Sequence, residues 1–322
     1  MPKNHIRASI ALAVLSTLTL AACSKKESAP APAEQTPPPA QTEAATPGSI
    51  RIGELTGIAL KDGGLEFPND NKILAVGKTP EDVAAVLTAN GLPTDKLNLT
   101  ISPLLVKAAG RTLLFDTGAG TNFGPSAGEL SKSLADAGIQ ADQVTDIFIS
   151  HAHGDHVGGL INADGALAFP NAAIHLSAPE WTFLKDMKEE MAKATGNPRH
   201  AQMVAAITPK VAAFEPGAEL IPGVVKAVPI TGHTPGHSGY LIGSGESSLL
   251  YIGDSMHHYV ISVQKPDWTI AFDGDAPTAQ KSRAELIAQS AANKQRIYAV
   301  HFPYPGVGKF EQRGEGYVWV AE

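Results

Sequence analysis

The chain has 322 residues, of which 43% are hydrophobic and 18% charged, so its composition is globular and its length allows one large domain or two. Its formal net charge is −7, and Lys and Arg are nowhere clustered along it. Because binding to a phosphate backbone needs clustered basic side chains, this balance argues against a nucleic acid as substrate or partner.

The first residues are typical of a targeting signal rather than of a fold. Lys3 and Arg7 give a basic start, and residues 8–20 form an apolar stretch too short to span a bilayer comfortably. The stretch ends in Leu20-Ala21-Ala22-Cys23, which resembles the lipobox of bacterial lipoproteins, whose cysteine is lipidated and becomes the first mature residue. The alternative is an ordinary signal peptide with an incidental cysteine.

The lipobox resemblance implies that residues 1–22 are a lipoprotein signal peptide and that the protein faces the periplasm. The lipid on Cys23 would be its membrane anchor, and Ser24 after it favours the outer membrane. Residues 23–48 are rich in Pro, Ala and polar side chains and cannot bury enough apolar surface to order themselves, so we expect a flexible tether. The folded domain is then residues 49–322. Because Cys23 is the only cysteine, no disulfide or thiol ligand is expected in it.

Strand and helix patterns alternate along this domain. Strands are predicted at residues 50–60, 98–107, 112–115, 145–149, 224–230, 239–242, 248–252 and 297–300. Helices are predicted from Thr79-Pro80 onward, and at residues 129–137, 178–194 and 281–292. The second and third strands, which flank Gly110, form a hairpin. Runs of strands interleaved with helices indicate a layered α/β protein, with sheets packed on each other and helices outside.

The segment His151-Ala152-His153-Gly154-Asp155-His156 carries most of the functional information. Four side chains that bind metals follow directly after the apolar residues 147–149, so the end of a strand aims them into one small volume. Buried without partners, such groups would cost several kcal/mol, and a divalent cation compensates them directly. The alternative is a solvated histidine-rich loop.

Three later strands also end at residues that can bind metals. Residues 228–230 precede His233, residues 250–252 precede Asp254, and residues 297–300 precede His301. One such residue alone is usually a hydrogen-bonded loop residue. Together with the histidine cluster, they predict a metal site at one edge of a sheet.

The order of these motifs resembles the metallo-β-lactamase superfamily, in its binuclear hydrolase branch. The motifs that carry the resemblance are the 151–156 cluster, Gly232-His233-Thr234-Pro235-Gly236-His237, Gly253-Asp254 and the late His301. The resemblance runs from about residue 50 to the end. It implies an αββα sandwich with two metal ions at one edge between the sheets. It also implies the ligands: His151, His153 and His233 for one ion, Asp155, His156 and His301 for the other, and Asp254 as the bridge.

Further residues are expected to support this site. In Leu114-Phe115-Asp116-Thr117-Gly118 the resemblance implies that Asp116 orients a metal-binding histidine, and the alternative is a simple turn residue. We expect His237 to brace the loop of His233 and His257 to line the pocket near Asp254, with His258 facing elsewhere. His175 and His200 are expected to be surface or core residues.

Three aromatic residues are candidates for an apolar substrate wall. Phe123 is one of them, and the other two are Trp181 and Phe183, which lie on a predicted helix and fit the protein core equally well. Within the superfamily the resemblance is closest to methyl parathion hydrolase and the N-acyl homoserine lactonases. It is carried by Phe123-Gly124-Pro125, residues 169–172 and residues 301–306.

This resemblance implies a hydrolase that uses a metal-bridging hydroxide on lactones, esters or phosphotriesters, with small, neutral and apolar substrates. Asp155 is a candidate to pass a proton to the leaving alkoxide. The N/O ligand set suits two Zn ions best, and Mn, Fe or Co would be accepted. Two alternatives stay open: a persulfide dioxygenase with a single iron and a thioesterase similar to glyoxalase II. The latter's C-terminal helical region has no obvious counterpart in this chain.

Overall fold

Two seven-stranded sheets organise residues 47–322, which are the part of the chain described by the computed structural model. The first sheet has the order β1 (Ser49–Ile52), β2 (Leu55–Ala59), β6 (Leu104–Ala108), β7 (Arg111–Phe115), β8 (Asp146–Phe148), β9 (Ala173–Ser177) and β10 (Val211–Phe214). The second has the order β11 (Glu219–Ile221), β12 (Val225–Pro229), β13 (Ser238–Ile242), β14 (Leu249–Tyr251), β16 (Arg296–Tyr298), β17 (Val307–Arg313) and β18 (Gly316–Ala321).

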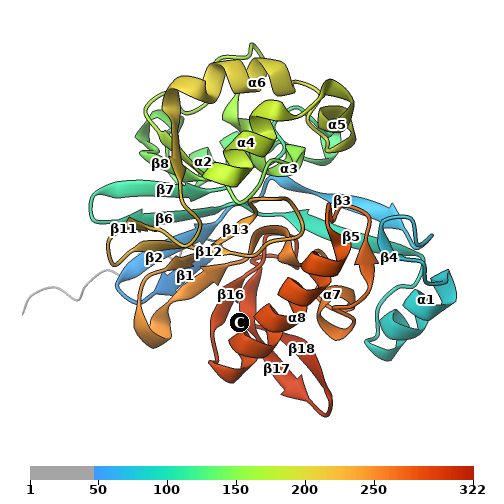
Figure 1. The fold of residues 1–322 in the computed structure, drawn as a ribbon. Coiled ribbons are helices and arrows are strands. Elements are labelled where there is room, and N and C mark those ends of the chain that lie inside the picture. Colours follow the sequence, from blue (N-terminus) through green and yellow to red (C-terminus); the bar gives the residue numbers. More distant parts are fainter. Residues whose placement is uncertain (1–46) are drawn as a thin grey trace, which may run out of the picture. The chain divides into compact units, whose positions relative to one another are not determined.

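The helices are α1 (Pro80–Ala89), α2 (Leu130–Asp136), α3 (Gly154–Val157), α4 (Ala178–Asp186), α5 (Glu189–Ala194), α6 (His200–Ile207), α7 (Ile261–Gln264) and α8 (Ala276–Ala292). Helices α2, α4, α5 and α6 pack on the outer face of the first sheet and α8 on that of the second, whereas α1 packs beside them against the small sheets described next (Figure 1). Two small sheets pair β3 (Gly63–Pro68) with β5 (Lys96–Ile101), and β4 (Leu74–Val76) with β15 (Thr269–Ile270).

The apolar core has separate layers because side chains alternate along each strand. In β7, Leu113 and Phe115 face the core between the two sheets, whereas Leu114 packs under the helices on the outer face. In β14, Tyr251 faces the core between the sheets, and Leu250 packs on the outer side with Ile287 of α8. These layers confirm the predicted αββα sandwich.

The predicted start of helix α1 and the predicted hairpin of β6 and β7 are confirmed, whereas helix α8 starts earlier than predicted. Helix α1 begins at Pro80 with a capping box in which the Thr79 side chain accepts from the N–H of Asp82, while the Asp82 carboxylate accepts from the N–H of Thr79. Strands β6 and β7 form the predicted hairpin. Helix α8 is longer than predicted, since it begins at Ala276 after the N-cap Asp275.

Three elements that were predicted as continuous are each divided into two in the structure. Residues 50–60 form the hairpin β1–β2, which turns at Gly53 with a φ of +58°. Residues 98–107 are divided between β5 and β6, which belong to different sheets. The helix predicted at 178–194 breaks into α4 and α5, because Met187 has an extended backbone (ψ 125°) and its side chain packs into the core.

The predicted signal peptide, Cys23 and nearly all of the tether lie outside the described residues. Strand β1 begins at Ser49, where the folded domain was expected to start. Between residues 47 and 322, none of the helices combines the length and apolar character needed to cross a membrane.

Candidate metal centre

The seven predicted ligands come together where strands of both sheets end. Strand β8 of the first sheet leads into residues 151–156, whereas β12, β14 and β16 of the second sheet lead into His233, Asp254 and His301. Strands β14 and β16 are parallel, so they deliver their following residues to the same edge. All seven residues are at most 9% exposed.

Three imidazoles form the first group of candidate ligands. The Nε2 atom of His233 lies 3.2 Å from Nε2 of His151 and 3.0 Å from Nδ1 of His153. Oδ2 of Asp254 lies 3.6 Å from Nε2 of His151 and 3.5 Å from Nε2 of His233. These four residues therefore direct one nitrogen or oxygen each toward a common point.

The second group faces the other oxygen of the same carboxylate. Oδ1 of Asp254 lies 3.0 Å from Nε2 of His156 and 2.9 Å from Nε2 of His301. Oδ2 of Asp155 lies 3.6 Å from each of these two nitrogens. Since the two oxygens of Asp254 address different groups, its position fits a carboxylate that bridges two ions.

Buried polar atoms without hydrogen-bond partners gather at this point. Of the five such side-chain atoms within residues 47–322, four belong to His156, Asp254 and His257. A buried group left unpaired costs about 1–3 kcal/mol, so four in one place call for a bound species. Imidazole nitrogens and carboxylate oxygens are donors that divalent transition metals accept, and the residues therefore fit a binuclear metal site.

The electrostatics of the two groups differ. Burial holds the pKa of His151 and of His153 well below the usual range, which keeps both imidazoles in the neutral form that binds metals. Burial also opposes charge on His156, but Asp254, Asp155 and Asp116 beside it raise the pKa of that imidazole well above its usual range. The carboxylates of the second group thus favour positive charge, which a divalent cation would supply.

Outer hydrogen bonds orient the candidate ligand rings. Nδ1 of His233 lies 3.0 Å from Oδ1 of Asp273, whose other oxygen is paired with the buried Arg283 at 2.8 Å. Nδ1 of His301 donates to the main-chain oxygen of Thr100 over 2.7 Å. Such contacts fix which ring nitrogen is free to face the centre.

Asp116 contacts His156, as the resemblance implies for a residue that orients a metal-binding histidine. Its Oδ2 lies 2.7 Å from Nδ1 of His156, and it also accepts from the hydroxyl groups of Ser150 and Tyr251, each at 2.7 Å. The main-chain N–H of Ser150 donates to its Oδ1 over 2.7 Å. Asp116 lies directly after β7 with a φ of +57°, so the turn and the orienting role occur together.

His237 braces the loop of His233, as predicted. Its Nε2 accepts from the main-chain N–H of Asp254 over 2.9 Å, so its Nδ1 carries the proton and donates to the main-chain oxygen of Ile230 over 2.9 Å. Burial lowers the pKa of His237 to about 3, which keeps this tautomer neutral. The ring thereby connects the start of the His233 loop with the Asp254 turn.

Glu180 is a supporting residue that the sequence analysis missed. Its carboxylate is fully buried and accepts from the N–H of Ala152 at 2.7 Å, the hydroxyl of Thr234 at 2.8 Å and the N–H of Gly236 at 2.9 Å. Ala152 lies between two candidate ligands and Thr234 follows a third. Asp62 was missed too: it accepts from three N–H groups of residues 119–130 and holds the loop that contains Phe123.

A cavity of about 480 Å³ opens onto both groups of ligands. Phe123 and His257 line it as predicted, together with Asp155, Asp254 and apolar side chains of β3, β5 and residues 271–272. His257 places Nε2 3.1 Å from Oδ2 of Asp254. Phe123 packs directly over Gly196, where an added Cβ would lie 2.4 Å from its ring.

The other aromatic and histidine candidates lie as follows. Phe183 lines a neighbouring cavity of about 540 Å³ that also contains His153 and His233. Trp181 packs half-buried against the core under the first sheet, which is the alternative that the sequence left open. His200 is a core residue bonded to the main-chain oxygen of Leu184, and His175 stacks on Phe148 with 4.7 Å between ring centroids. His258 faces away from the ligands into a different cavity, as expected.

Comparison with solved structures gives close relatives of this fold and site. AidC, a dizinc quorum-quenching lactonase in complex with the product N-hexanoyl-L-homoserine, is 31% identical with a TM-score of 0.79, over 85% of this chain and 96% of that one. The hydrolase AbOPH of the β-lactamase superfamily is 28% identical with a TM-score of 0.76, over 87% of this chain and 98% of that one.

Curated relatives match over shorter segments. Ribonuclease Z of Salinibacter ruber is 39% identical over 79 residues, which are 24% of this chain and 21% of that protein, so the match spans about a fifth of the relative. A probable metallo-hydrolase of Mycobacterium tuberculosis is 26% identical over 137 residues, or 40% and 42% of the two chains. The profile of the metallo-beta-lactamase superfamily matches residues 99–301, more than half of the chain. The chain therefore belongs to the metallo-β-lactamase superfamily and is a metal-dependent hydrolase.

Proposed function

We propose that this hydrolase opens lactones, above all neutral lactones that carry an apolar acyl portion, such as N-acyl homoserine lactones. The observation that carries the proposal is the similarity to the dizinc lactonase AidC over nearly the whole folded domain, combined with a complete set of seven candidate ligands. Esters and phosphotriesters are further substrates of the same centre.

The cavity supports a neutral substrate. Its apolar walls include Leu65, Phe67 and Phe123, and its one basic side chain, Lys193, is paired with Glu189 at 2.6 Å. No cluster of cations among the lining residues would hold a strongly anionic molecule. An acyl chain therefore gains from burial against these walls, by about 25 cal/mol for each Å² of apolar surface.

The reaction follows from the position of the residues around the centre. Two divalent ions, which we propose to be Zn, would activate a water molecule and polarise the substrate carbonyl when bound. His151, His153 and His233 would hold one ion and Asp155, His156 and His301 the other, with the carboxylate of Asp254 between the two groups. Asp155 lines the cavity, so we assign to its carboxylate the acceptance of a proton from the attacking water and its transfer to the leaving alkoxide.

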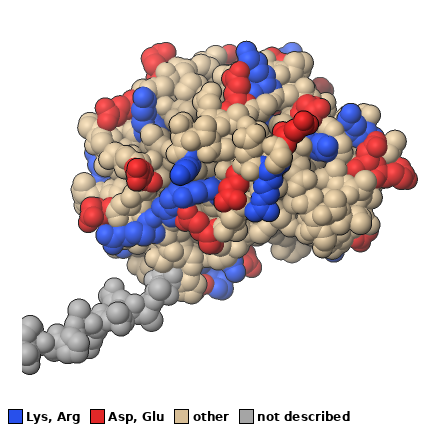
Figure 2. Space-filling model, turned by 90° about the horizontal axis from the view of Figure 1, so that it is seen from below, with Lys and Arg blue, Asp and Glu red and all other residues tan. Residues whose placement is uncertain are grey.

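Two alternatives are less well supported. A dioxygenase with one iron would leave one of two complete ligand groups without a cation. The ribonuclease Z matches are local, and on the face shown in Figure 2 acidic side chains are interspersed among the basic ones. This face therefore lacks the continuous positive surface that binding to a nucleic acid requires.

A substrate panel on the metal-loaded protein tests the proposal. We expect kcat/KM for N-hexanoyl homoserine lactone or an aryl ester to exceed kcat/KM for methyl parathion. A protein that ignores lactones and esters but rapidly cleaves phosphotriesters, or a glutathione thioester, would contradict it. Oxygen consumption with a persulfide would favour the dioxygenase instead.

We also propose that the protein is a lipoprotein anchored through Cys23 in the outer membrane and facing the periplasm. The support is the Leu20-Ala21-Ala22-Cys23 pattern followed by Ser24. Labelling with a fatty acid should mark the wild-type protein, and Cys23→Ala should abolish the label and normal maturation. Recovery of the wild-type protein only as soluble, unlabelled material would overturn this assignment.

A further inference from the structure

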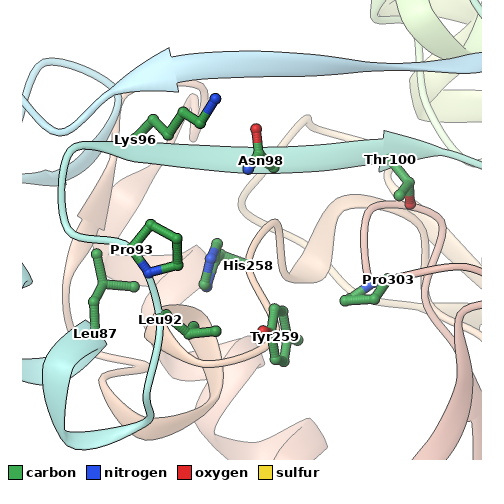
Figure 3. A pocket seen from close by; sticks show the side chains of 9 residues that line it. All are labelled: Leu87, Leu92, Pro93, Lys96, Asn98, Thr100, His258, Tyr259 and Pro303. Atoms are coloured by element: carbon green, nitrogen blue, oxygen red, sulfur yellow. The ribbon is translucent and has the colours of Figure 1, made fainter.

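A second cavity, of about 260 Å³, lies beside strand β5 (Figure 3), on the strand face opposite to the one that lines the metal cavity. Side chains alternate along this strand, so that Leu99 lines the metal cavity while Asn98 and Thr100 line the second one. The loop after α1 and residues 258–259 complete its walls, as Figure 3 shows. The two cavities therefore share a wall that is one strand thick.

Two consecutive histidines likewise line different cavities. His257 lines the metal cavity, and its neighbour His258 lines the second cavity. Their main-chain N–H groups both donate to the hydroxyl of Ser262, over 3.3 Å and 3.1 Å. This shared anchor holds the two rings on opposite sides of one short segment.

His258 directs an unused hydrogen-bond donor into the second cavity. The residue is 4% exposed, and its Nδ1 accepts from the N–H groups of Val260 and Ile261, each over 3.2 Å. Because Nδ1 is an acceptor, the proton of the neutral ring is on Nε2. Burial lowers the pKa of His258 to about 4, so the ring is neutral at pH 7. This Nε2–H has no partner among residues 47–322.

The remaining walls select a neutral ligand with a short apolar part. Leu87, Leu92 and Pro93 form an apolar side. Asn98, an exposed residue at the mouth of the cavity, offers a side-chain donor and acceptor that bond to no other group of residues 47–322. Lys96 at the rim has its ammonium group 2.7 Å from Glu66, so its charge is already compensated.

The second cavity also touches a residue that positions a candidate metal ligand. The main-chain oxygen of Thr100 accepts from Nδ1 of His301, and its hydroxyl donates to the main-chain oxygen of Val300 over 3.0 Å. A molecule held against Thr100 and His258 would thus contact the supports of His301 and His257 without entering the metal cavity.

We propose that this cavity is a second ligand site, which binds a neutral secondary amide with a short alkyl chain. The amide oxygen accepts from Nε2–H of His258, the amide N–H donates to Oδ1 of Asn98, and the alkyl chain packs on Leu87 and Leu92. The site is independent of the substrate of the metal centre, so the proposal stands or falls separately from the lactonase assignment.

The test is a titration of the full-length, metal-loaded protein with N-methylbutanamide, followed by ¹H–¹⁵N NMR at millimolar concentration. We expect saturable shifts of the amide signals of Leu92, Asn98 and Tyr259. His258→Asn keeps an acceptor for the N–H groups of Val260 and Ile261 but removes the ring donor, and it should bind about three- to tenfold more weakly. Leu92→Trp should fill the cavity and abolish binding, whereas Lys132→Gln, a control at an exposed lysine of α2 outside the cavity, should bind as the wild type does.

The outcome that would overturn the proposal is equally specific. Shifts confined to residues around Phe123 and Gly196 would place the amide in the metal cavity. Wild-type affinity in both His258→Asn and Leu92→Trp would show that this cavity does not bind it, and so would the absence of saturable shifts.

Discussion

Glu180→Gln tests how the first group of candidate ligands is held in place. One oxygen of the Glu180 carboxylate accepts from the N–H of Ala152, and the other accepts from Thr234 and Gly236. The three donors lie on the loops that carry His151, His153 and His233. Glutamine keeps one accepting oxygen but brings an NH₂ group against a main-chain N–H, so at least one of these contacts must break.

We expect the variant to bind metal more weakly at this group alone. Loss of a contact that orients metal ligands typically lowers metal affinity by about 10- to 100-fold. The group of Asp155, His156 and His301 has no contact with Glu180 in the described structure, so its affinity should change little. Glu189→Gln, an exposed glutamate on the neighbouring helix α5, is the matched control and should leave both affinities unchanged.

The free energy of unfolding of the metal-free protein should depend on pH through Glu180, and the size of this dependence follows from the pKa shift. Burial raises the pKa of Glu180 to about 7 from an ordinary value of 4.5. The folded protein therefore binds more protons than the unfolded chain between these pH values, and the stabilisation by this carboxyl falls as the pH rises. At about 1.4 kcal/mol per pKa unit, the free energy of unfolding of the wild type should fall by about 3 kcal/mol relative to Glu180→Gln across this window.

Two assays separate these effects. Competition with a chelator at pH 8 measures the two metal affinities, and urea unfolding of the metal-free proteins at pH 4.5 to 8 measures stability. At pH 8 the variant should bind metal more weakly at the first group, and its stability relative to the wild type should be about 3 kcal/mol higher than at pH 4.5. Wild-type affinity at both groups, or a stability difference that does not change with pH, would refute the reasoning.

Two further variants test the centre and its cavity. Asp254→Ala should remove the carboxylate between the two ligand groups, lower the metal content measured by elemental analysis and abolish hydrolysis. His175→Ala is the control and should remain active, because its ring stacks on Phe148 away from the cavity. Full activity of Asp254→Ala with two metals bound would disprove the bridge. Phe123→Ala should weaken the preference for apolar substrates, seen as a smaller ratio of kcat/KM between long-chain and short-chain lactones, and an unchanged ratio would remove Phe123 from the substrate wall.

The candidate ligands could be predicted from sequence because each follows directly after a short apolar strand. Residues 147–149 end at Ser150, and the next residue is already a ligand. Parallel neighbours such as β14 and β16 bring their following residues to one edge, so local pattern and topology agree. Asp116, which directly follows β7, was implied by the resemblance of residues 114–118, with a simple turn residue as the alternative.

The supports of the ligands could not be predicted in the same way. In Ser177-Ala178-Pro179-Glu180 the local pattern is a capping box, in which Glu180 would reach back to the N–H of Ser177. Ser177 does cap α4, but the Glu180 carboxylate bonds instead to residues 28 and 56 positions away. His301 is oriented by the main-chain oxygen of Thr100. Every residue has such an oxygen, so the sequence does not reveal this contact.

Errors in strand continuity have a related cause. Residues 98–107 are apolar enough for one strand, but the chain leaves β5 at Ser102-Pro103 and enters a different sheet as β6. Proline lacks the N–H that a strand in the interior of a sheet needs, so Pro103 marks the change. Which sheet each half joins depends on partners far along the chain.

The metal content of the active protein tests the central claim most directly. Two divalent ions per chain should be found in protein that hydrolyses a lactone, activity should be lost when a chelator removes them, and Zn should restore it. A single iron per chain with oxygen consumption, or full hydrolysis by metal-free protein, would contradict the assignment of a binuclear hydrolase.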